Sequence, residues 1–204
     1  MGTAIGGIMS RVEASLRIDL PAWLAEAASQ CAPLAGDEAR MAFVIGLARR
    51  NVETRSGGPF AAAVFESASG RLLAAATNLV VASRCSAAHA EILALSLAQQ
   101  VRGRFDLGAA GMPACDLVSS VEPCTMCAGA VLWSGVRRLV CGASGEDACA
   151  IGFDEGPKHP DWANELRGRG IEVVDGVLRP QAVAVLEHYR AGGGHIYNAR
   201  ASGA

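Results

Sequence analysis

Hydrophobic and polar positions alternate along the chain with two different periods, which predicts a succession of helices and strands. Apolar residues recur at near-helical spacing over about 38–53, and Asp37 just before them is a suitable N-cap. Two strand-like runs follow at 60–66 and 71–78. The short segment 67–70 between them predicts a β-hairpin.

The second half of the chain alternates between helical and strand-like patterns. The expected helices cover about 89–100, 124–134, 161–168 and 180–190, and the expected strands cover about 116–120, 138–141 and 171–174. The 29 residues between Cys141 and Ile171 include a helix, so they are long enough for a crossover and allow parallel pairing of the last two strands. The pattern predicts an α/β domain with a helix-covered mixed sheet of about five strands.

The two ends of the chain differ from this central pattern. Residues 1–36 have no clear period, and Pro21 and Pro33 interrupt the two stretches that could otherwise be helical. We therefore expect an N-terminal extension, 1–36, packed on a domain of residues 37–191. Three consecutive glycines then open a C-terminal tail, 192–204.

Composition and charge narrow the class of protein. The chain has 204 residues, of which 51% are hydrophobic and 19% charged, as in a globular protein with a substantial core. Its formal net charge is −2, and Lys158 is its single lysine. Because no basic stripe is present, we expect no nucleic-acid partner. No apolar run approaches the length of a membrane span, so we expect no membrane partner either.

Cysteine usage indicates a reducing compartment. The chain has seven cysteines, an odd number, and its amino-terminal residues do not resemble a secretory signal. We expect a cytoplasmic protein in which closely spaced cysteines bind a metal or take part in catalysis instead of forming disulfides.

Two short motifs carry candidate chemistry, and each opens an expected helix. They are His89-Ala90-Glu91 and Pro123-Cys124-Thr125-Met126-Cys127. Cys124 and Cys127 are three residues apart and so face the same way, and a helix N-terminus favours the thiolate form. One imidazole and two thiolates make the three-ligand pattern of catalytic zinc, with a fourth position open to water. The spacing of the other cysteines and histidines recommends none of them as a fourth ligand.

Glu91 has a different expected role. It follows His89 by two residues, about 200° round an ideal helix, so both can approach one ion only from the open first turn. That position suits a carboxylate that contacts the water on the metal. Zinc lowers the pKa of such a water to about 7, and the carboxylate can carry its proton to a ring nitrogen and then to a leaving amine.

These residues resemble the cytidine-deaminase-like superfamily and, within it, the bacterial guanine deaminases. The similarity runs from about Glu38 to Arg200. It comprises the segments 57–63 (GGPFAAA), 77–78 (TN), 89–92 (HAEI), 122–127 (EPCTMC), Trp133, 152–155 (GFDE) and 196–200 (IYNAR). The resemblance implies a three-layer α/β/α fold and a Zn²⁺ cofactor. Compact members of the family have no counterpart of residues 1–36.

The resemblance also implies roles for individual side chains. Asn78 would hydrogen-bond the base, and Phe60 would pack near the purine, beside Ala90. Trp133 would stack on the base or wall it off. Each of these also has a structural alternative, as a turn residue or a core residue.

A second acidic group and the tail complete the expected site. Glu155 matches an acidic residue that assists proton transfer at the amine, with Asp154 as the alternative. Tyr197 and His195 are candidate lid residues, because the C-terminal segment of guanine deaminases covers the active site. That segment can be exchanged between the subunits of a homodimer, so the resemblance implies a homodimer.

The expected function is hydrolytic deamination of guanine, a small-molecule nucleobase, to xanthine and ammonia. Amino-s-triazines such as ammeline present a similar edge and are a plausible second substrate. One alternative is a tRNA adenosine or cytosine deaminase, whose motif is nearly identical. Another is a non-catalytic, zinc-stabilised interaction domain, against which Glu91 argues because a structural site would not need that carboxylate.

Overall fold

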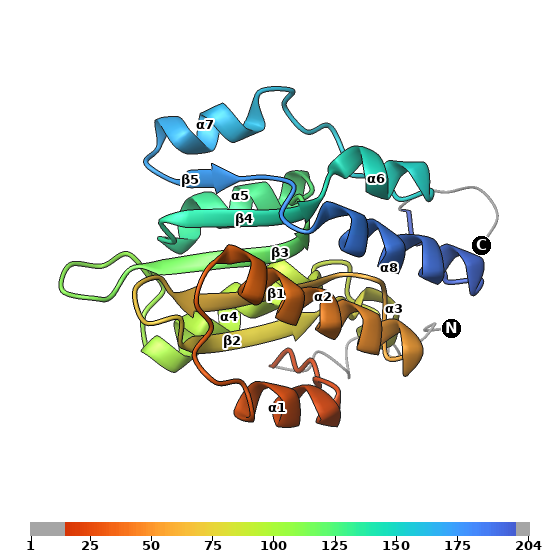
Figure 1. The fold of residues 1–204 in the computed structure, drawn as a ribbon, viewed down its shortest axis with the longest axis horizontal. Coiled ribbons are helices and arrows are strands. Elements are labelled where there is room, and N and C mark those ends of the chain that lie inside the picture. The colour runs from red at the N-terminus through yellow and green to blue at the C-terminus, as the bar shows by residue number, and fades with distance from the viewer. Residues whose placement is uncertain (1–14, 199–204) are drawn as a thin grey trace, which may run out of the picture.

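A five-stranded mixed sheet covered by helices on both faces forms the centre of the molecule (Figure 1). The computed structural model describes residues 15–198. The strands are β1 (Ala61–Glu66), β2 (Leu72–Thr77), β3 (Cys115–Val121), β4 (Arg138–Ala143) and β5 (Glu172–Val174). The helices are α1 (Ala22–Ser29), α2 (Asp37–Glu53), α3 (Val80–Ser83), α4 (Ala90–Arg102), α5 (Thr125–Ser134), α6 (Gly145–Ala150), α7 (Trp162–Gly168) and α8 (Arg179–Ala191).

Strand order and direction agree with the expected topology. The order is β2-β1-β3-β4-β5; β1 is antiparallel to both of its neighbours, and β3, β4 and β5 are parallel. The hairpin and the parallel last pair are therefore confirmed. Because β1 runs against β3, the start of β1 and the end of β2 lie at the same sheet edge as the carboxyl end of β3. Ligand sites of open α/β sheets form at such carboxyl edges.

Two apolar cores, one on each face of the sheet, hold the layers together. Successive side chains of a strand point to opposite faces, so Ala63 and Phe65 belong to one core and Ala62 and Val64 to the other. The first core includes buried residues of α1, α2, α6 and α8, and the second includes buried residues of α4, α5 and α7. This is the expected three-layer α/β/α arrangement.

Three short helices depart from the sequence-based expectation. Helix α1 begins directly after Pro21, which starts the helix instead of breaking it, and Leu24 is 1% exposed within the first core. Helix α6 begins at a capping box between Ser144 and Asp147. Helix α3 has only four residues. Helices this short draw their stability mostly from tertiary packing, which periodicity does not reveal.

Asp37 is not the N-cap that the sequence predicts. Gly36 occupies the N-cap position with φ of 78°, and Asp37 is the first helical residue. Its carboxylate instead accepts hydrogen bonds of 3.0 Å from both terminal nitrogens of Arg138 on β4. A tertiary ion pair thus replaces the expected local cap.

A buried ion pair fastens α2 to the sheet. The Arg40 Nη1 atom donates to Asp116 Oδ2 on β3 at 2.7 Å, and the two side chains are 6% and 1% exposed. Asp116 also accepts from the Ser67 hydroxyl at 2.6 Å. The pair is thus saturated with hydrogen bonds, which offset the cost of burying its charges.

Replacing Asp116 by Ala is expected to destabilise the protein by about 3–5 kcal/mol, because Arg40 would remain buried without its partner. Urea unfolding measures this loss. The control is Asp175→Ala, which breaks the half-exposed 3.6 Å pair with Arg167 and is expected to cost less than about 1 kcal/mol. Equal losses of stability in the two variants would contradict the role of Asp116 as the partner of a buried charge.

No helix within residues 15–198 combines the length and apolar character needed to cross a membrane.

Candidate active site

Two helix N-termini bring the HAE and CxxC motifs together. His89 is the N-cap of α4, Cys124 is the N-cap of α5, and Cys127 lies in the first turn of α5. The His89 Nδ1 atom is 3.5 Å from Cys124 Sγ and 3.5 Å from Cys127 Sγ. Within residues 15–198, these three form the only group of metal-ligating side chains that converge on one point.

The donor set fits zinc. Bonds of about 2.1 Å to nitrogen and 2.3 Å to sulfur at tetrahedral angles require a nitrogen–sulfur separation of about 3.6 Å, close to the 3.5 Å observed. A hydrogen bond from Cys127, with a second from His89, lowers the pKa of the Cys124 thiol to about 4. Cys124 therefore already favours the thiolate form that binds metals, whereas the hydrogen bond with Cys124, together with burial, raises the pKa of the Cys127 thiol.

Glu91 lies beside this group with a perturbed pKa. Its side chain is buried in the first turn of α4 and lines the same pocket as His89 and Cys124. Burial, together with the negative charge on Cys124, raises the pKa of the Glu91 carboxyl to about 6. A carboxyl that titrates near neutral pH can both accept and return a proton, as a general acid–base must.

Glu155 reaches the pocket from the loop after α6. Burial, with the charges of Cys124 and Glu91, raises the pKa of its carboxyl to about 7. Its backbone carbonyl accepts hydrogen bonds from the backbone N–H and the hydroxyl of Thr125, both at 3.1 Å. The loop is thereby fastened to the start of α5, next to Cys124. The neighbouring Asp154 also lines the pocket but is exposed.

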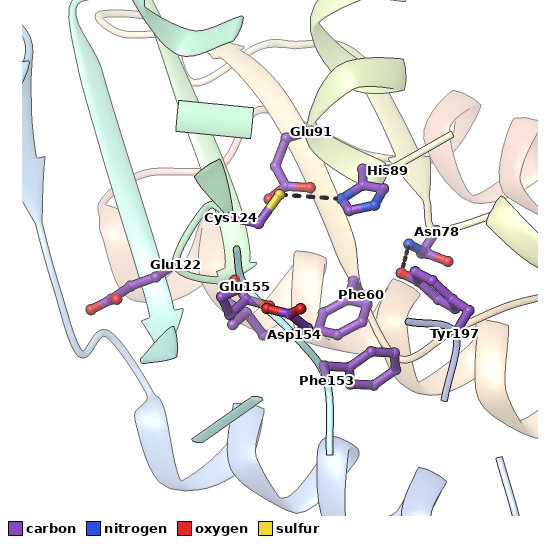
Figure 2. A pocket seen from close by; sticks show the side chains of 11 residues that line it. Phe60, Asn78, His89, Glu91, Glu122, Cys124, Phe153, Asp154, Glu155 and Tyr197 are labelled. Carbon is purple, nitrogen blue, oxygen red and sulfur yellow. Dashed lines mark hydrogen bonds between the residues drawn. The ribbon is translucent and has the colours of Figure 1, made fainter. Parts of the chain in front are cut away.

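Aromatic side chains form the opposite wall of the pocket (Figure 2). The rings of Phe60 and Phe153 pack edge to face with centroids 4.8 Å apart, and Tyr197 packs edge to face on Phe153 at 5.3 Å. The Tyr197 ring also lies 6.1 Å from that of His89. The site thus combines an apolar wall with a few converging polar groups, as small-molecule sites do.

The C-terminal tail closes this pocket within its own chain. The Asn78 side-chain amide donates to the Tyr197 hydroxyl at 2.6 Å. The Asn198 side chain donates to the Gly152 carbonyl at 2.9 Å and accepts from the Asp154 N–H at 3.0 Å. The remaining cavity measures about 30 Å³, roughly the space of one water molecule.

A buried amide holds Asn78 in place. Asn51 on α2 is fully buried, and its Nδ2 atom donates to the carbonyls of Gly58 at 2.8 Å and Asn78 at 3.1 Å. A Cβ atom on Gly58 would lie 2.9 Å from Asn78 Oδ1, and one on Gly57 would overlap the Asn78 carbonyl. The glycine pair therefore allows the loop to approach Asn78 closely.

The structure does not bring every expected residue to the pocket. Trp133 is 83% exposed on the outside of α5, because nine residues after Cys124 it lies about 180° round the helix and about 13.5 Å along it. Ala90 is fully buried in the second core and does not line the pocket. His195 is exposed outside the pocket. Neither Trp133 nor Ala90 lines the pocket, so their expected substrate contacts stay predictions.

Three pocket residues lacked an expected role. Val121 ends β3, Glu122 follows it directly before Pro123, and Phe153 precedes Asp154. Both groups adjoin residues that the motifs single out. Their position next to motif residues in the sequence could have suggested that these three residues lie near the site. Only the tertiary structure shows that they line the cavity.

Comparisons with known proteins agree with this geometry. The family model of the cytidine and deoxycytidylate deaminase zinc-binding region matches residues 35–143. The guanine deaminase of Bacillus subtilis (strain 168) is 36% identical over 111 residues, which are 54% of this chain and 67% of that protein.

Two solved structures resemble the whole fold. A guanine deaminase from Nitrosomonas europaea is 55% identical with a TM-score of 0.85, over 89% of this chain and 99% of that one. The structure of NE0047 in complex with 2,6-diaminopurine is 57% identical with a TM-score of 0.86, over 92% and 98% of the two chains.

The three-layer fold, the three convergent ligands and the buried glutamate define the zinc-binding deaminases, which are aminohydrolases. The chain belongs to the cytidine and deoxycytidylate deaminase zinc-binding family.

Proposed function

We propose that the chain hydrolyses guanine to xanthine and ammonia. The observation that carries the proposal is the presence of a second carboxyl, Glu155, in the pocket that holds Glu91 and the three ligands. Similarity to guanine deaminases extends over most of the chain and supports the choice of base. In this reaction water adds to the carbon that bears the amino group, and the bond from that carbon to the amine nitrogen breaks.

His89, Cys124 and Cys127 would hold the zinc ion. When bound, zinc supplies a water activated as a nucleophile near neutral pH. Glu91 takes a proton from the water and transfers it to the ring nitrogen. Glu155, whose pKa is raised to about 7 by burial, donates a proton to the leaving amine, and the hydroxyl of the adduct returns a proton to Glu155 as the C=O bond forms. Asn78 orients the base through its side-chain amide, and Phe60 packs against the ring.

Release of ammonia from a panel of substrates tests the proposal. Zinc-loaded protein is expected to act on guanine, with slower release from the s-triazine ammeline, whose amino-bearing edge is similar. Failure to release ammonia from guanine would overturn the proposal. Preferred turnover of cytosine, or of adenosine in tRNA, would favour those alternatives, although a net charge of −2 and one lysine disfavour an RNA substrate.

The tail is proposed to act as a lid. Ligand pockets usually exceed about 300 Å³, so a base can enter the present 30 Å³ cavity only if the tail segment moves. Asn78, the residue proposed to bind the base, is hydrogen-bonded to Tyr197 while the lid is closed.

The division of the chain into an extension, 1–36, a domain, 37–191, and a tail, 192–204, stays a prediction. Residues 1–14 and 199–204 of the extension and the tail lie outside the described part.

Tyr197→Ala is expected to lower kcat/KM for guanine by about 100-fold, since the ring that closes the pocket against water is lost. The matched control is Tyr197→Phe, which keeps the packing on Phe153 and removes only the hydroxyl, and it should stay within about fivefold of wild type. Steady-state kinetics measure both. Similar activity in Tyr197→Ala and wild type would contradict the role as a lid.

An exposed apolar face suggests a homodimer. The shallow hollow between α4 and α5 is lined by Ile92, Leu95, Ser96, Gln99, Ala130 and Trp133, none of them charged. We propose that a second copy of the chain covers this face, because an exposed tryptophan beside uncharged neighbours is typical of an interface.

Sedimentation measurements test the dimer. The wild type is expected to sediment as a dimer and Trp133→Glu as a monomer, because a charge would be buried at the interface. A control change on the opposite side of the sheet, Arg179→Glu on α8, should leave the mass unchanged. A monomeric wild type would contradict the proposal.

A cytoplasmic location is also proposed. All seven cysteines are free in the structure, and two of them are needed as metal ligands. A reducing compartment would keep them in that form. A thiol titration of the unfolded protein purified from its native cells should find seven free thiols, and fewer would contradict this proposal.

A further inference from the structure

The single lysine of the chain is held beside the active site. The Lys158 Nζ atom donates to Glu122 Oε2 at 3.0 Å and to the Pro123 carbonyl at 3.3 Å. It also lies 4.7 Å from the centre of the Trp162 ring. The Lys158 side chain is only 15% exposed, whereas lysine side chains usually keep their ammonium groups in water. This confinement calls for a specific role.

Lys158 joins three separate segments. Glu122 follows the end of β3, and its Oε2 atom also accepts from the backbone N–H of Gly145 at the start of α6, at 3.0 Å. A Cβ atom on Gly145 would lie 3.0 Å from Lys158 Nζ, so the ammonium group is packed closely against this backbone. In Figure 2 the Glu122 carboxylate points away from the other labelled side chains. Glu122 lines the pocket, but the carboxylate that pairs with Lys158 is thus directed away from Glu91 and His89.

The loop that contains Lys158 also presents Glu155 to the pocket. It is attached at two points three residues apart: the Glu155 carbonyl bonds to Thr125, and Lys158 bonds to Glu122 and Pro123. Both attachments are to the segment that leads into the CxxC helix. The same Cβ on Gly145 would lie 3.8 Å from Glu155 Cγ, so Gly145 is in contact range of both side chains.

We propose that Lys158 is a positioning residue: its bonds to Glu122 and Pro123 fix the 155–158 loop so that the Glu155 carboxyl stays directed into the pocket. This inference rests on the role of Glu155 in the proposed function. Without the ammonium group, the Glu122 carboxylate would keep only the Gly145 N–H, and residues 155–158 would be hydrogen-bonded to other segments through Thr125, with Asp154 beside them still bonded to Asn198. The Glu155 side chain could then leave its position beside Glu91.

A double-mutant cycle separates this role from a general effect on stability. Lys158→Met keeps the length of the side chain and removes its charge. It is expected to lower kcat for guanine about tenfold while Glu155 is present, since a displacement of about 1 Å can cost up to 100-fold. In the Glu155→Ala background the same change is expected to cost less than about twofold. Lys158→Arg should restore most of the activity, and Arg179→Met, which breaks the ion pair between α8 and Asp147 of α6, should stay near wild type.

Amide hydrogen exchange supplies a readout that does not depend on activity. The amides of Glu155, Gly156 and residue 158 are expected to exchange faster in Lys158→Met than in wild type, with no such change in Arg179→Met. Equal kinetic costs of Lys158→Met in both backgrounds, or unchanged exchange, would overturn the inference. If wild-type protein loaded with zinc releases no ammonia from guanine, the proposed function fails, and the exchange measurement still decides whether Lys158 holds the loop.

Discussion

Glu91→Gln is expected to bind one zinc ion per chain, as the wild type should, and to lose guanine turnover by about 1,000-fold. The amide has nearly the same shape as the carboxyl, so the pocket and the three ligands stay in place. It cannot accept a proton from water, and general acid–base groups typically contribute 10²–10⁴-fold in rate. Ammonia release and zinc content of the same preparation measure the two halves of this result.

The matched control is Glu165→Gln, which makes the same chemical change on the exposed surface of α7. It should retain full activity. Turnover by Glu91→Gln at the wild-type rate would show that another group carries the proton. Loss of zinc from this variant would instead show that Glu91 is needed for metal binding.

Cys127→Ala is expected to lose both zinc and activity. Cys127 is fully buried, and its Sγ atom lies 3.5 Å from the His89 ring nitrogen. Its removal leaves two protein ligands, too few for either a structural or a catalytic zinc site. Mutation of residues that hydrogen-bond metal ligands typically lowers metal affinity about 10–100-fold. Loss of a ligand itself should therefore lower it by more than about 100-fold.

Metal analysis after dialysis measures this effect. The control is Cys149→Ala, which removes an exposed thiol outside the site and should keep one zinc ion per chain. A Cys127→Ala protein with wild-type zinc content would rule out the assigned ligand set. Removal of zinc from the wild type by a chelator should abolish turnover, and added zinc should restore it.

Local sequence patterns predict the framework of this protein well. The hairpin of β1 and β2 follows from two strand-like runs with a short connection, and the parallel pairing of β4 and β5 follows from the length of chain between them. Helices α3 and α6 were not expected, because four and six residues are too few to show a helical period. Helix α1 was missed because Pro21 suits the start of a helix as well as its interruption.

Some features of the candidate site could likewise be predicted from the sequence, and others could not. The metal ligands could be assigned from sequence because a three-residue spacing in a first helical turn puts both thiolates on one side. The same helix geometry puts Trp133, nine residues after Cys124, on the other side of α5. The contact of Asn78 with Tyr197, which spans 119 positions, and that of Glu122 with Lys158, which spans 36, could not be predicted in this way.

By itself, then, the sequence determined the α/β class, the hairpin, the two metal-binding motifs and the glutamate beside them, because each depends on residues a few positions apart. Only the tertiary structure decided which side chains share the pocket, that the tail closes it through Tyr197, and that Lys158 fastens the loop of Glu155. Those contacts join segments whose approach is set by the packing of helices on the sheet, and no local periodicity encodes such a distance.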